Sequence, residues 1–243
     1  QQVLSYFNAK DLNGWSPAGS SLETAFEHII SLLGRLIDVN FVQTADAYQA
    51  NTIAVSTNAQ TDSGGYAAYP DSSRIYDDFR GSDIFMDESN VDPSITRLNY
   101  DLEILVHELG HALGLKHPFS HENASGNIAQ GPYLTSSLEE NNRWTAMSYE
   151  DSSSYYSASF RPLDLAALQY MYGVSVSANA GNTTFTFNPY QGTFVYDGQG
   201  IDEIDATSAT AAATIYLTQG DWSYMGVKSD LITARNQMTI NFN

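Results

Sequence analysis

The chain has 243 residues, enough for one large domain or for a catalytic domain with a smaller appendage. Its 28 Asp and Glu residues against 10 Lys and Arg give a net charge of −18, which repels phosphate backbones and argues against nucleic acid as a partner. The absence of Cys excludes a disulfide framework and a thiol nucleophile, and no apolar run approaches the ~20 residues that span a bilayer.

The first half of the chain is predicted to mix helices and strands. Apolar residues at helical spacing indicate one helix over residues 21–36 and a second over 99–115. Short apolar runs between them indicate four strands, at 39–43, 52–56, 65–70 and 83–86. Pro70 confines the third of these strands to a sheet edge or a strand end, because proline cannot donate a ladder hydrogen bond.

The composition changes after a third helix, which is expected to begin at Pro162 and to end at Gly173. The residues that follow are rich in Thr, Asn, Gly and Ala. Short alternating stretches there favour β structure with frequent turns, as at 183–187 and 214–217. We therefore expect an α+β fold, with a catalytic domain over residues 1–173 and a small β-rich C-terminal module over 174–243.

The strongest feature of the sequence is the run HELGHALGLKH at residues 107–117. On an α-helix His107 and His111 lie on one face and can direct their ring nitrogens at one point. A helix that continued would carry the third histidine roughly 9 Å further along its axis. Gly114 permits a left-handed turn that ends the helix, so that His117 can swing back as a third ligand. Three imidazoles predict zinc, which accepts nitrogen ligands in tetrahedral geometry.

Zinc with three protein ligands keeps a fourth position open for water, which marks a catalytic and not a closed structural site. Glu108 follows the first ligand and can face that position without binding the metal. Its predicted role is to take a proton from the water and to pass it to the leaving amine. The alternative is a coincidence on a core helix, but a chance match to all five fixed positions is expected in on the order of one sequence in 10⁵.

These residues resemble the metzincins, a group of zinc endopeptidases that share the motif of residues 107–117. Pro118 and a Met-turn-like stretch, TAMSY at residues 145–149, are similar to the serralysin-type branch of bacterial proteases, which are exported with a calcium-binding tail. Residues 162–173, PLDLAALQYMYG, resemble the helix that ends the catalytic domain of that branch. The resemblance implies a metzincin-type domain with a mixed twisted sheet, long helices and an active-site helix.

The resemblance also implies roles for residues outside the motif. Met147 would form an apolar floor beneath the zinc, and Tyr149 would act as an extra, displaceable ligand that then donates a hydrogen bond to the oxyanion. The alternatives are that Met147 is plain core and that Tyr149 only packs. The predicted edge strand would pair with an extended substrate by β-augmentation, through Gly65, Tyr66, Ala67, Ala68 and Tyr69.

A second metal site is expected in the β-rich module, where residues 197–205, DGQGIDEID, resemble half a turn of glycine–aspartate calcium repeats. Asp197 and Asp202 could supply carboxylates to Ca²⁺, and main-chain carbonyls of the turn around Gln199 would complete the oxygen shell. The resemblance adds carbonyls from a facing loop, those of Asn179, Gly181 and Thr183. The alternative is an acidic surface turn, because Gln199 stands where the family has Gly and these 243 residues contain no tandem G-G-x-G-x-D repeats.

The sequence thus predicts a secreted, extracellular bacterial zinc endopeptidase that hydrolyses extended polypeptides through a metal-activated water. Zn²⁺ and Ca²⁺ are the expected cofactors and polypeptides the expected substrates. We expect a monomer, with a proteinaceous inhibitor as a further candidate partner. Two alternatives stay open: a processing protease of narrow specificity, and a binding or adhesion module that keeps the fold without turnover. Glu108 and Tyr149 argue against the second, because a scaffold without turnover needs no general base.

Overall fold

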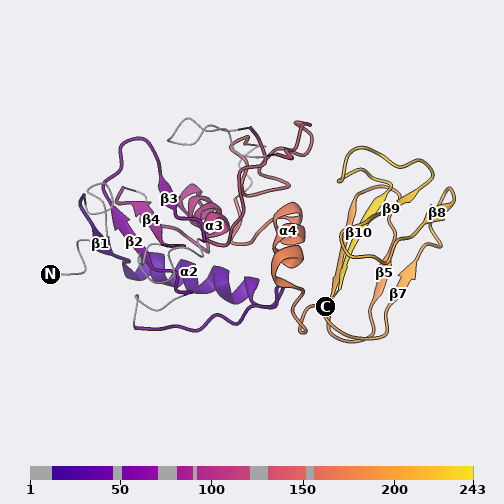
Figure 1. Cartoon of the computed structure of the whole chain (residues 1–243), viewed down its shortest axis with the longest axis horizontal. Helices are drawn as coiled ribbons and strands as arrows, with labels where there is room; N and C mark the ends of the chain where they lie inside the picture. Colours follow the sequence, from indigo (N-terminus) through magenta and orange to yellow (C-terminus); the bar gives the residue numbers. More distant parts are fainter. Residues whose placement is uncertain are drawn as a thin grey trace. The chain divides into compact units, whose positions relative to one another are not determined.

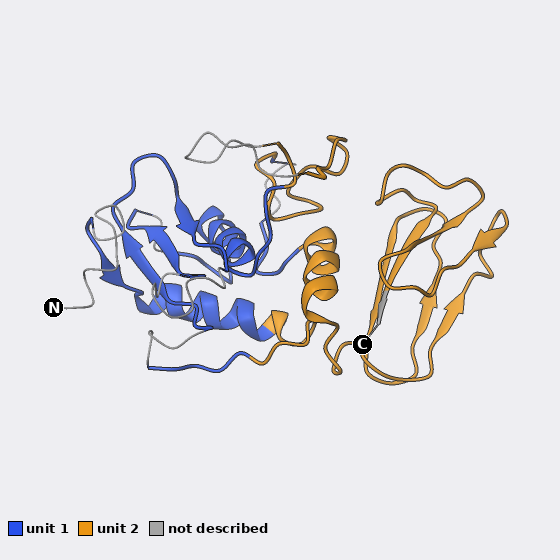
Figure 2. Ribbon diagram, viewed as in Figure 1, with its two compact units in different colours: residues 1–31, 41–117, 151–160 blue, residues 32–40, 118–150, 161–243 orange. Residues whose placement is uncertain are grey.

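The computed structural model describes residues 13–45, 51–70, 81–89, 92–120, 131–151 and 156–242. The chain divides into two compact units, each built from segments that are separated in the sequence (Figure 2). Unit 1 contains residues 1–31, 41–117 and 151–160, and unit 2 contains residues 32–40, 118–150 and 161–243. Because both units are discontinuous, they do not test a domain boundary at residue 174, which stays a prediction.

Unit 1 contains a four-stranded mixed sheet in the order β1-β2-β4-β3 (Figure 1). Its strands are β1 (Ser16–Pro17), β2 (Val55–Asn58), β3 (Gly65–Ala67) and β4 (Ile84–Asp87). The two central strands, β2 and β4, are parallel, and each outer strand is antiparallel to its neighbour. The mixed sheet with its helices confirms the expected α+β class, and β3 lies at the sheet edge, as Pro70 predicts.

Two helices accompany this sheet. Helix α2 (Ser20–Leu33) buries a stripe of apolar residues at helical spacing, Leu22, Ala25, Ile29 and Leu33. Helix α3 (Tyr100–Ala112) begins where the Asn99 side chain accepts a hydrogen bond from the backbone N–H of Leu102, and it packs against β3 and β4. Every residue of α3 from Leu102 to Ala112 is buried, including four polar ones. Buried polar side chains on a core helix require partners or a function.

Some expected elements of this half are absent or shorter. The strand expected at 39–43 is wrong, because residues 39–44 have no regular structure. The first helix was expected to reach residue 36 but ends at Leu33. Residues 36–38 form hydrogen bonds with residues 173–175; for example, Asp38 N–H donates to the Gly173 carbonyl. The strand expected at 52–56 begins later, at Val55, and the strand expected at 65–70 ends at Ala67. The strand at 83–86 is confirmed to within one residue.

Unit 2 contains helix α4 (Pro162–Tyr172), with the predicted proline at its start and Gly173 at its end, where φ is 85°. Its buried Asp164 carboxylate accepts hydrogen bonds from Thr145 Oγ1 at 2.6 Å, from Ala146 N at 2.7 Å and from Arg161 N at 3.0 Å. Burial raises the pKa of Asp164, and these hydrogen bonds oppose the shift. One buried carboxylate therefore fastens the turn at residues 145–147 to the start of α4.

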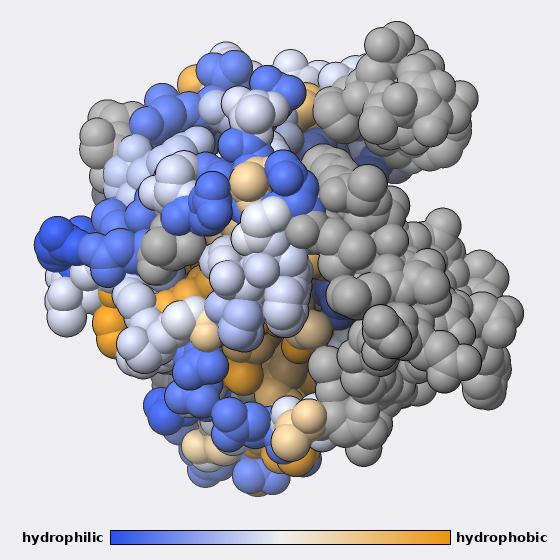
Figure 3. Space-filling view, turned by 90° about the vertical axis from the view of Figure 1, so that its left-hand side faces the viewer, coloured by the Kyte–Doolittle hydropathy of each residue, from blue (hydrophilic) through white to orange (hydrophobic). Residues whose placement is uncertain are grey.

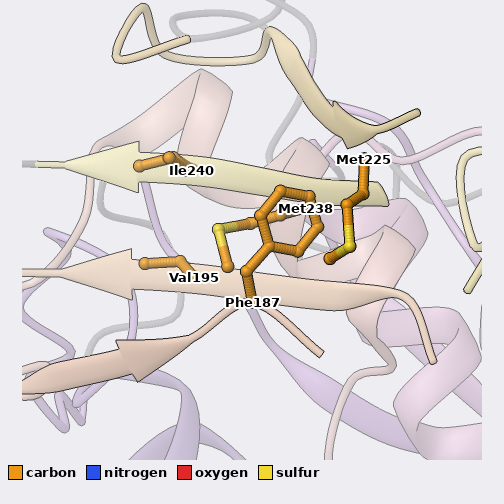
Figure 4. Packing of buried hydrophobic residues seen from close by; sticks show 5 residues of the cluster. All are labelled: Phe187, Val195, Met225, Met238 and Ile240. Atoms are coloured by element: carbon orange, nitrogen blue, oxygen red, sulfur yellow. The ribbon is translucent and has the colours of Figure 1, made fainter. Parts of the chain in front are cut away.

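The rest of unit 2 is β-rich, as the composition predicts. Strands β6 (Thr193–Asp197), β10 (Gln237–Phe242), β9 (Trp222–Met225) and β8 (Ala213–Thr214) form one sheet in that order. Strands β5 (Thr184–Thr186) and β7 (Glu203–Asp205) form a parallel pair. The stretch predicted as β structure at 183–187 contains β5, and the one at 214–217 overlaps the end of β8. A small core joins the strands, made by Phe187, Val195, Met225, Met238 and Ile240 (Figure 4).

The described surface agrees with the acidic composition. Where the residues are described, the face drawn in Figure 3 is mostly hydrophilic, with smaller apolar areas between the polar side chains. Among the described residues, no helix is both long enough and apolar enough to cross a membrane.

Asp164→Ala is expected to lower the free energy of unfolding by about 3 kcal/mol, because three buried donors lose their acceptor. Urea titration followed by circular dichroism measures the loss. The control is Asp221→Ala, which removes an exposed carboxylate from the same unit and is expected to change stability by less than about 0.5 kcal/mol. Equal stability of the two variants would refute the fastening role of Asp164.

Candidate active site

The structure brings three buried imidazoles together. His107 and His111 come from α3 and His117 from the segment after it. The Nε2 atom of His117 lies 3.2 Å from Nε2 of His107 and 3.1 Å from Nε2 of His111. Nitrogens bound to one tetrahedral zinc at ~2.05 Å lie about 3.3 Å apart. The three side chains therefore fit a zinc ion, and among the described residues they are the one group of three or more such ligands.

The end of α3 explains how the third histidine returns. Leu115 N–H donates to the Gly110 carbonyl at 2.8 Å, and Gly114 N–H donates to the His111 carbonyl at 2.9 Å. This pair of hydrogen bonds is the Schellman arrangement that closes a helix around a left-handed residue. Gly114 takes that position with φ of 97°, where a side chain would be strained. The chain then reverses, and His117 approaches the two helical histidines.

The same turn fixes the orientation of His111. Its Nδ1 atom lies 2.7 Å from the carbonyl oxygen of Leu115. Because a carbonyl only accepts hydrogen bonds, Nδ1 must carry the proton, and Nε2 keeps its lone pair for a metal. A hydrogen bond of this kind to the second ring nitrogen is typical of metal-binding histidines. It involves a backbone oxygen, so the sequence analysis had no signal for it.

Glu108 is buried between α3 and the edge strand. Burial raises the pKa of its carboxyl group to about 8, and a hydrogen bond from the backbone N–H of Ala67 opposes the shift. Its Oε2 atom has no hydrogen-bond partner among the described residues. A buried oxygen of this kind is costly unless a ligand, a water or a cation meets it. Glu108 thus has one oxygen tied to the protein and one available for chemistry.

Strand β3 packs directly on this part of α3. A Cβ atom at Gly65 would lie 3.0 Å from Cγ of Glu108 and 3.0 Å from Cγ2 of Ile104, closer than side chains ordinarily pack. Two strand positions further along, the main chain of Ala67 reaches Glu108, and two further still the ring of Tyr69 reaches His111, with centroids 5.2 Å apart. Gly65, Ala67 and Tyr69 therefore all contact α3.

The hydrogen bonds of β3 sort four of the five predicted substrate residues into two groups. Asp87 N–H donates to the Gly64 carbonyl, and Ala68 N–H donates to the Asp83 carbonyl. In an antiparallel ladder the intervening residues then direct their backbone groups away from the partner strand. Tyr66 and Ala68 are therefore tied to β4, whereas Gly65 and Ala67 face the open edge. Within the described residues no strand pairs with that edge.

Met147 and Tyr149 lie in unit 2. Met147 is buried, and its N–H donates to Thr145 Oγ1 at 3.1 Å. Tyr149 is 65% exposed, and its ring lies 5.0 Å from that of Phe119. The buried Asp164 that holds this turn was not identified as a site residue in the sequence. The roles of Met147 and Tyr149 at the metal remain predictions.

The two loops proposed for calcium face each other within unit 2. Thr183 N–H donates to Asp202 Oδ1 at 2.9 Å, and Gly181 N–H donates to the Gln199 carbonyl at 2.9 Å. The Asn179 carbonyl accepts a hydrogen bond from Thr183 Oγ1. These contacts bring five of the predicted residues into one region, Asn179, Gly181, Thr183, Gln199 and Asp202, although the carbonyls of Asn179 and Gln199 already accept hydrogen bonds.

Asp197 is a buried carboxylate with an acidic neighbour. It is buried, and its Oδ2 atom has no hydrogen-bond partner among the described residues. Burial raises the pKa of Asp197, and the neighbouring carboxylate of Asp202 adds to the shift. Two carboxylates held this close repel each other unless a proton or a cation lies between them. This pair fits Ca²⁺, which prefers carboxylate and carbonyl oxygens.

Comparison with known proteins gives consistent matches. Residues 51–180 match the reprolysin-like metallopeptidases of family M12B. Serralysin B of Dickeya chrysanthemi is 29% identical over 74% of this chain and 41% of its own length. Serralysin of Proteus mirabilis is 28% identical over 72% of this chain and 40% of its own length. Metallopeptidase AprA of Pseudomonas marginalis is 25% identical over 91% of this chain and 51% of its own length. The chain thus spans about half the length of these relatives or less.

Gly65→Ala is expected to lower kcat/KM for peptide hydrolysis at least about 10-fold, because the added methyl group displaces Glu108 or the strand. Zinc content should stay at the wild-type level, since no histidine is touched. The control is Gly81→Ala in the same unit, where an added Cβ has no neighbour within 4 Å. Undiminished hydrolysis by Gly65→Ala would show that the close approach of β3 has no bearing on Glu108.

Proposed function

The chain belongs to the reprolysin-like metallopeptidases of family M12B and is a serralysin-type metzincin, and on this premise we propose that it cleaves extended polypeptides as a zinc endopeptidase. The observation that carries the proposal is the convergence of three imidazole nitrogens from His107, His111 and His117. The buried, unpartnered oxygen of Glu108 on the adjacent helix position supports a hydrolytic centre, not a closed structural one.

In this proposal the three histidines hold the metal through Nε2, and Leu115 keeps His111 in the required tautomer. When bound, zinc supplies Lewis acidity that polarises the scissile carbonyl and makes a water nucleophilic at neutral pH. Glu108, whose ionised form a neighbouring Zn²⁺ would favour, accepts one proton from that water as its oxygen attacks the carbonyl carbon. It then delivers the proton to the amide nitrogen as the C–N bond breaks, so protons balance over the two steps.

The edge of β3 is the proposed substrate-binding element. Gly65 directs its backbone N–H and C=O groups, and Ala67 its C=O group, away from β4, so an extended polypeptide can add to the sheet as a further strand. The Ala67 N–H is held by Glu108, so the strand also orients the base. Recognition through backbone groups favours broad acceptance of sequences, because every extended peptide offers the same donors and acceptors.

Two further residues enter the proposal through the resemblance to serralysins. Met147 would lie beneath the metal as an apolar support. Tyr149 would approach the metal when no substrate is bound and would donate a hydrogen bond to the oxyanion during hydrolysis. Their position in the TAMSY stretch supports these roles, as does the exposure of Tyr149, which leaves its phenol accessible to a ligand.

The proposed setting is extracellular and bacterial. It is supported by the bacterial relatives, by the resemblance to an exported branch and by the acidic composition. We further propose that the protein acts as a monomer and that a proteinaceous inhibitor can occupy the same edge as a substrate. A processing protease of narrow specificity is the second candidate. A non-catalytic binding or adhesion module is disfavoured by the cost of burying Glu108.

We also propose a calcium ion between the loops at residues 179–183 and 197–202. Asp197 and Asp202 would supply its charged ligands, with main-chain carbonyls as the neutral ones. Support comes from the unpartnered Asp197 oxygen and from the mutual repulsion of the two carboxylates. The ion would tie β6 and the turn that follows it to the loop that precedes β5.

Glu108→Ala is expected to keep one zinc per chain and to lose casein hydrolysis by ~10³-fold or more, because the proton acceptor is removed and no ligand is. Glu108→Gln, which keeps the size of the side chain, should lose about as much. Metal content by atomic absorption and hydrolysis rates measure both. Glu27→Ala, an exposed glutamate on α2, is the control and should be fully active. Unchanged hydrolysis by the Glu108 variants would remove this residue from the mechanism.

Calcium is expected to raise the thermal midpoint of the zinc-loaded protein by several degrees, because a ligand at 100 times its Kd adds about 2.7 kcal/mol to stability. Asp197→Asn and Asp202→Asn should each abolish the calcium-dependent rise, while Asp221→Asn should leave it intact. Differential scanning calorimetry with and without CaCl₂ measures the effect. If the thermal midpoint of the wild-type protein is the same with and without CaCl₂, the calcium site is excluded, and the zinc proposal is not affected.

A further inference from the structure

Tyr69 lies between the edge strand and the metal centre, and the hydrolytic mechanism leaves it without a role of its own. It follows β3 by two residues and is 48% exposed. Its ring stands edge-on to the His111 imidazole, at 5.2 Å between centroids and 68° between planes. Aromatic rings 4.5–7 Å apart in this T-shaped arrangement attract each other beyond simple burial. The contact therefore restrains a predicted metal ligand from the substrate side.

The His111 ring contacts both of the other histidines. Both neighbours stand nearly perpendicular to it, His107 at 4.7 Å and 89° and His117 at 4.6 Å and 85°. The hydrogen bond from Nδ1 to the Leu115 carbonyl fixes one atom of the ring. A single hydrogen bond still lets a ring tilt about the axis of that bond. Packing against the ring limits this tilt and so helps to set the direction of the Nε2 lone pair; Tyr69 packs against it from outside the histidine cluster.

The packing of β3 puts Tyr69 in position to make this contact. At Gly65 the strand approaches α3 so closely that a Cβ atom would touch Glu108 and Ile104. Tyr69 is four residues further on, two residues past the end of β3, and its ring also contacts α3. His111 lies one helical turn beyond Glu108 on α3. The missing side chain at Gly65 thus lets the strand lie close enough for the Tyr69 ring to reach the imidazole.

We propose that the ring of Tyr69 is a positioning group that holds the His111 imidazole in its metal-binding orientation. The proposal rests on the proposed function, because it takes His111 as a zinc ligand. It also links the two parts of the site, since the strand that receives the substrate carries the residue that steadies the ligand. The ring carries this role, and the phenol oxygen does not.

The test compares Tyr69→Phe, which keeps the ring, with Tyr69→Ala, which removes it, in the full 243-residue chain. The zinc Kd is measured by competition with a chelating indicator. Tyr69→Phe is expected to bind zinc within about 2-fold of wild type, and Tyr69→Ala about 10-fold more weakly. The visible spectrum of the Co²⁺-substituted protein should shift for Tyr69→Ala and not for Tyr69→Phe, because it reports ligand geometry.

Controls separate this inference from folding and from the proposed function. The zinc-free forms should share one thermal midpoint, and Tyr69→Leu, which keeps apolar bulk, replaces Tyr69→Ala if that variant unfolds. Tyr190→Ala removes an exposed tyrosine of unit 2 and should leave the zinc Kd unchanged. If His111→Ala bound zinc as tightly as wild type, His111 would not be a zinc ligand and the proposed function itself would be refuted. Wild-type zinc affinity in the Tyr69→Ala and Tyr69→Leu variants, or equal weakening in Tyr69→Phe, would overturn the positioning role alone.

Discussion

The termination of α3 at Gly114 is the constraint on which the candidate active site depends. A straight helix would carry His117 away from His107 and His111, whereas the left-handed glycine and its two closing hydrogen bonds turn the chain back. The same turn supplies the Leu115 carbonyl that fixes the His111 tautomer. Ligand convergence and ligand orientation therefore come from one local feature, which explains how so short a segment can build a metal site.

Burial changes the acidity of Glu108 and also makes this side chain costly to accommodate. Glu108 lies on a helix that is buried on every side, and its desolvation raises the pKa to about 8. A carboxyl group in such a place would be expelled or neutralised unless something compensates. The Ala67 N–H compensates at one oxygen, and the proposed metal and water would do so at the other. The free-energy cost of burying the Glu108 carboxyl group is itself an argument that this residue serves catalysis.

Strand β3 does more than present an edge. It packs on α3 at Gly65 and donates to Glu108 from Ala67, and Tyr69, two residues past its end, contacts His111. Because substrate would pair with this same strand, binding and chemistry share one rigid element. Unit 2 also contains buried carboxylates: Asp164 holds the turn at residues 145–147, and Asp197 in the β-rich part has an oxygen without a hydrogen-bond partner among the described residues.

The sequence by itself determined the features that local spacing encodes. The i, i+4 histidines, the glycine after them and the proline and glycine that bound α4 were all readable, because helix geometry and backbone sterics act over a few residues. Only the tertiary structure decided that residues 39–43 form no strand, that Ala67 holds Glu108, that Tyr69 contacts His111 and that Asp164 fastens a distant turn. Those outcomes depend on contacts between segments far apart in the chain, and no local pattern of residues specifies which segments will meet.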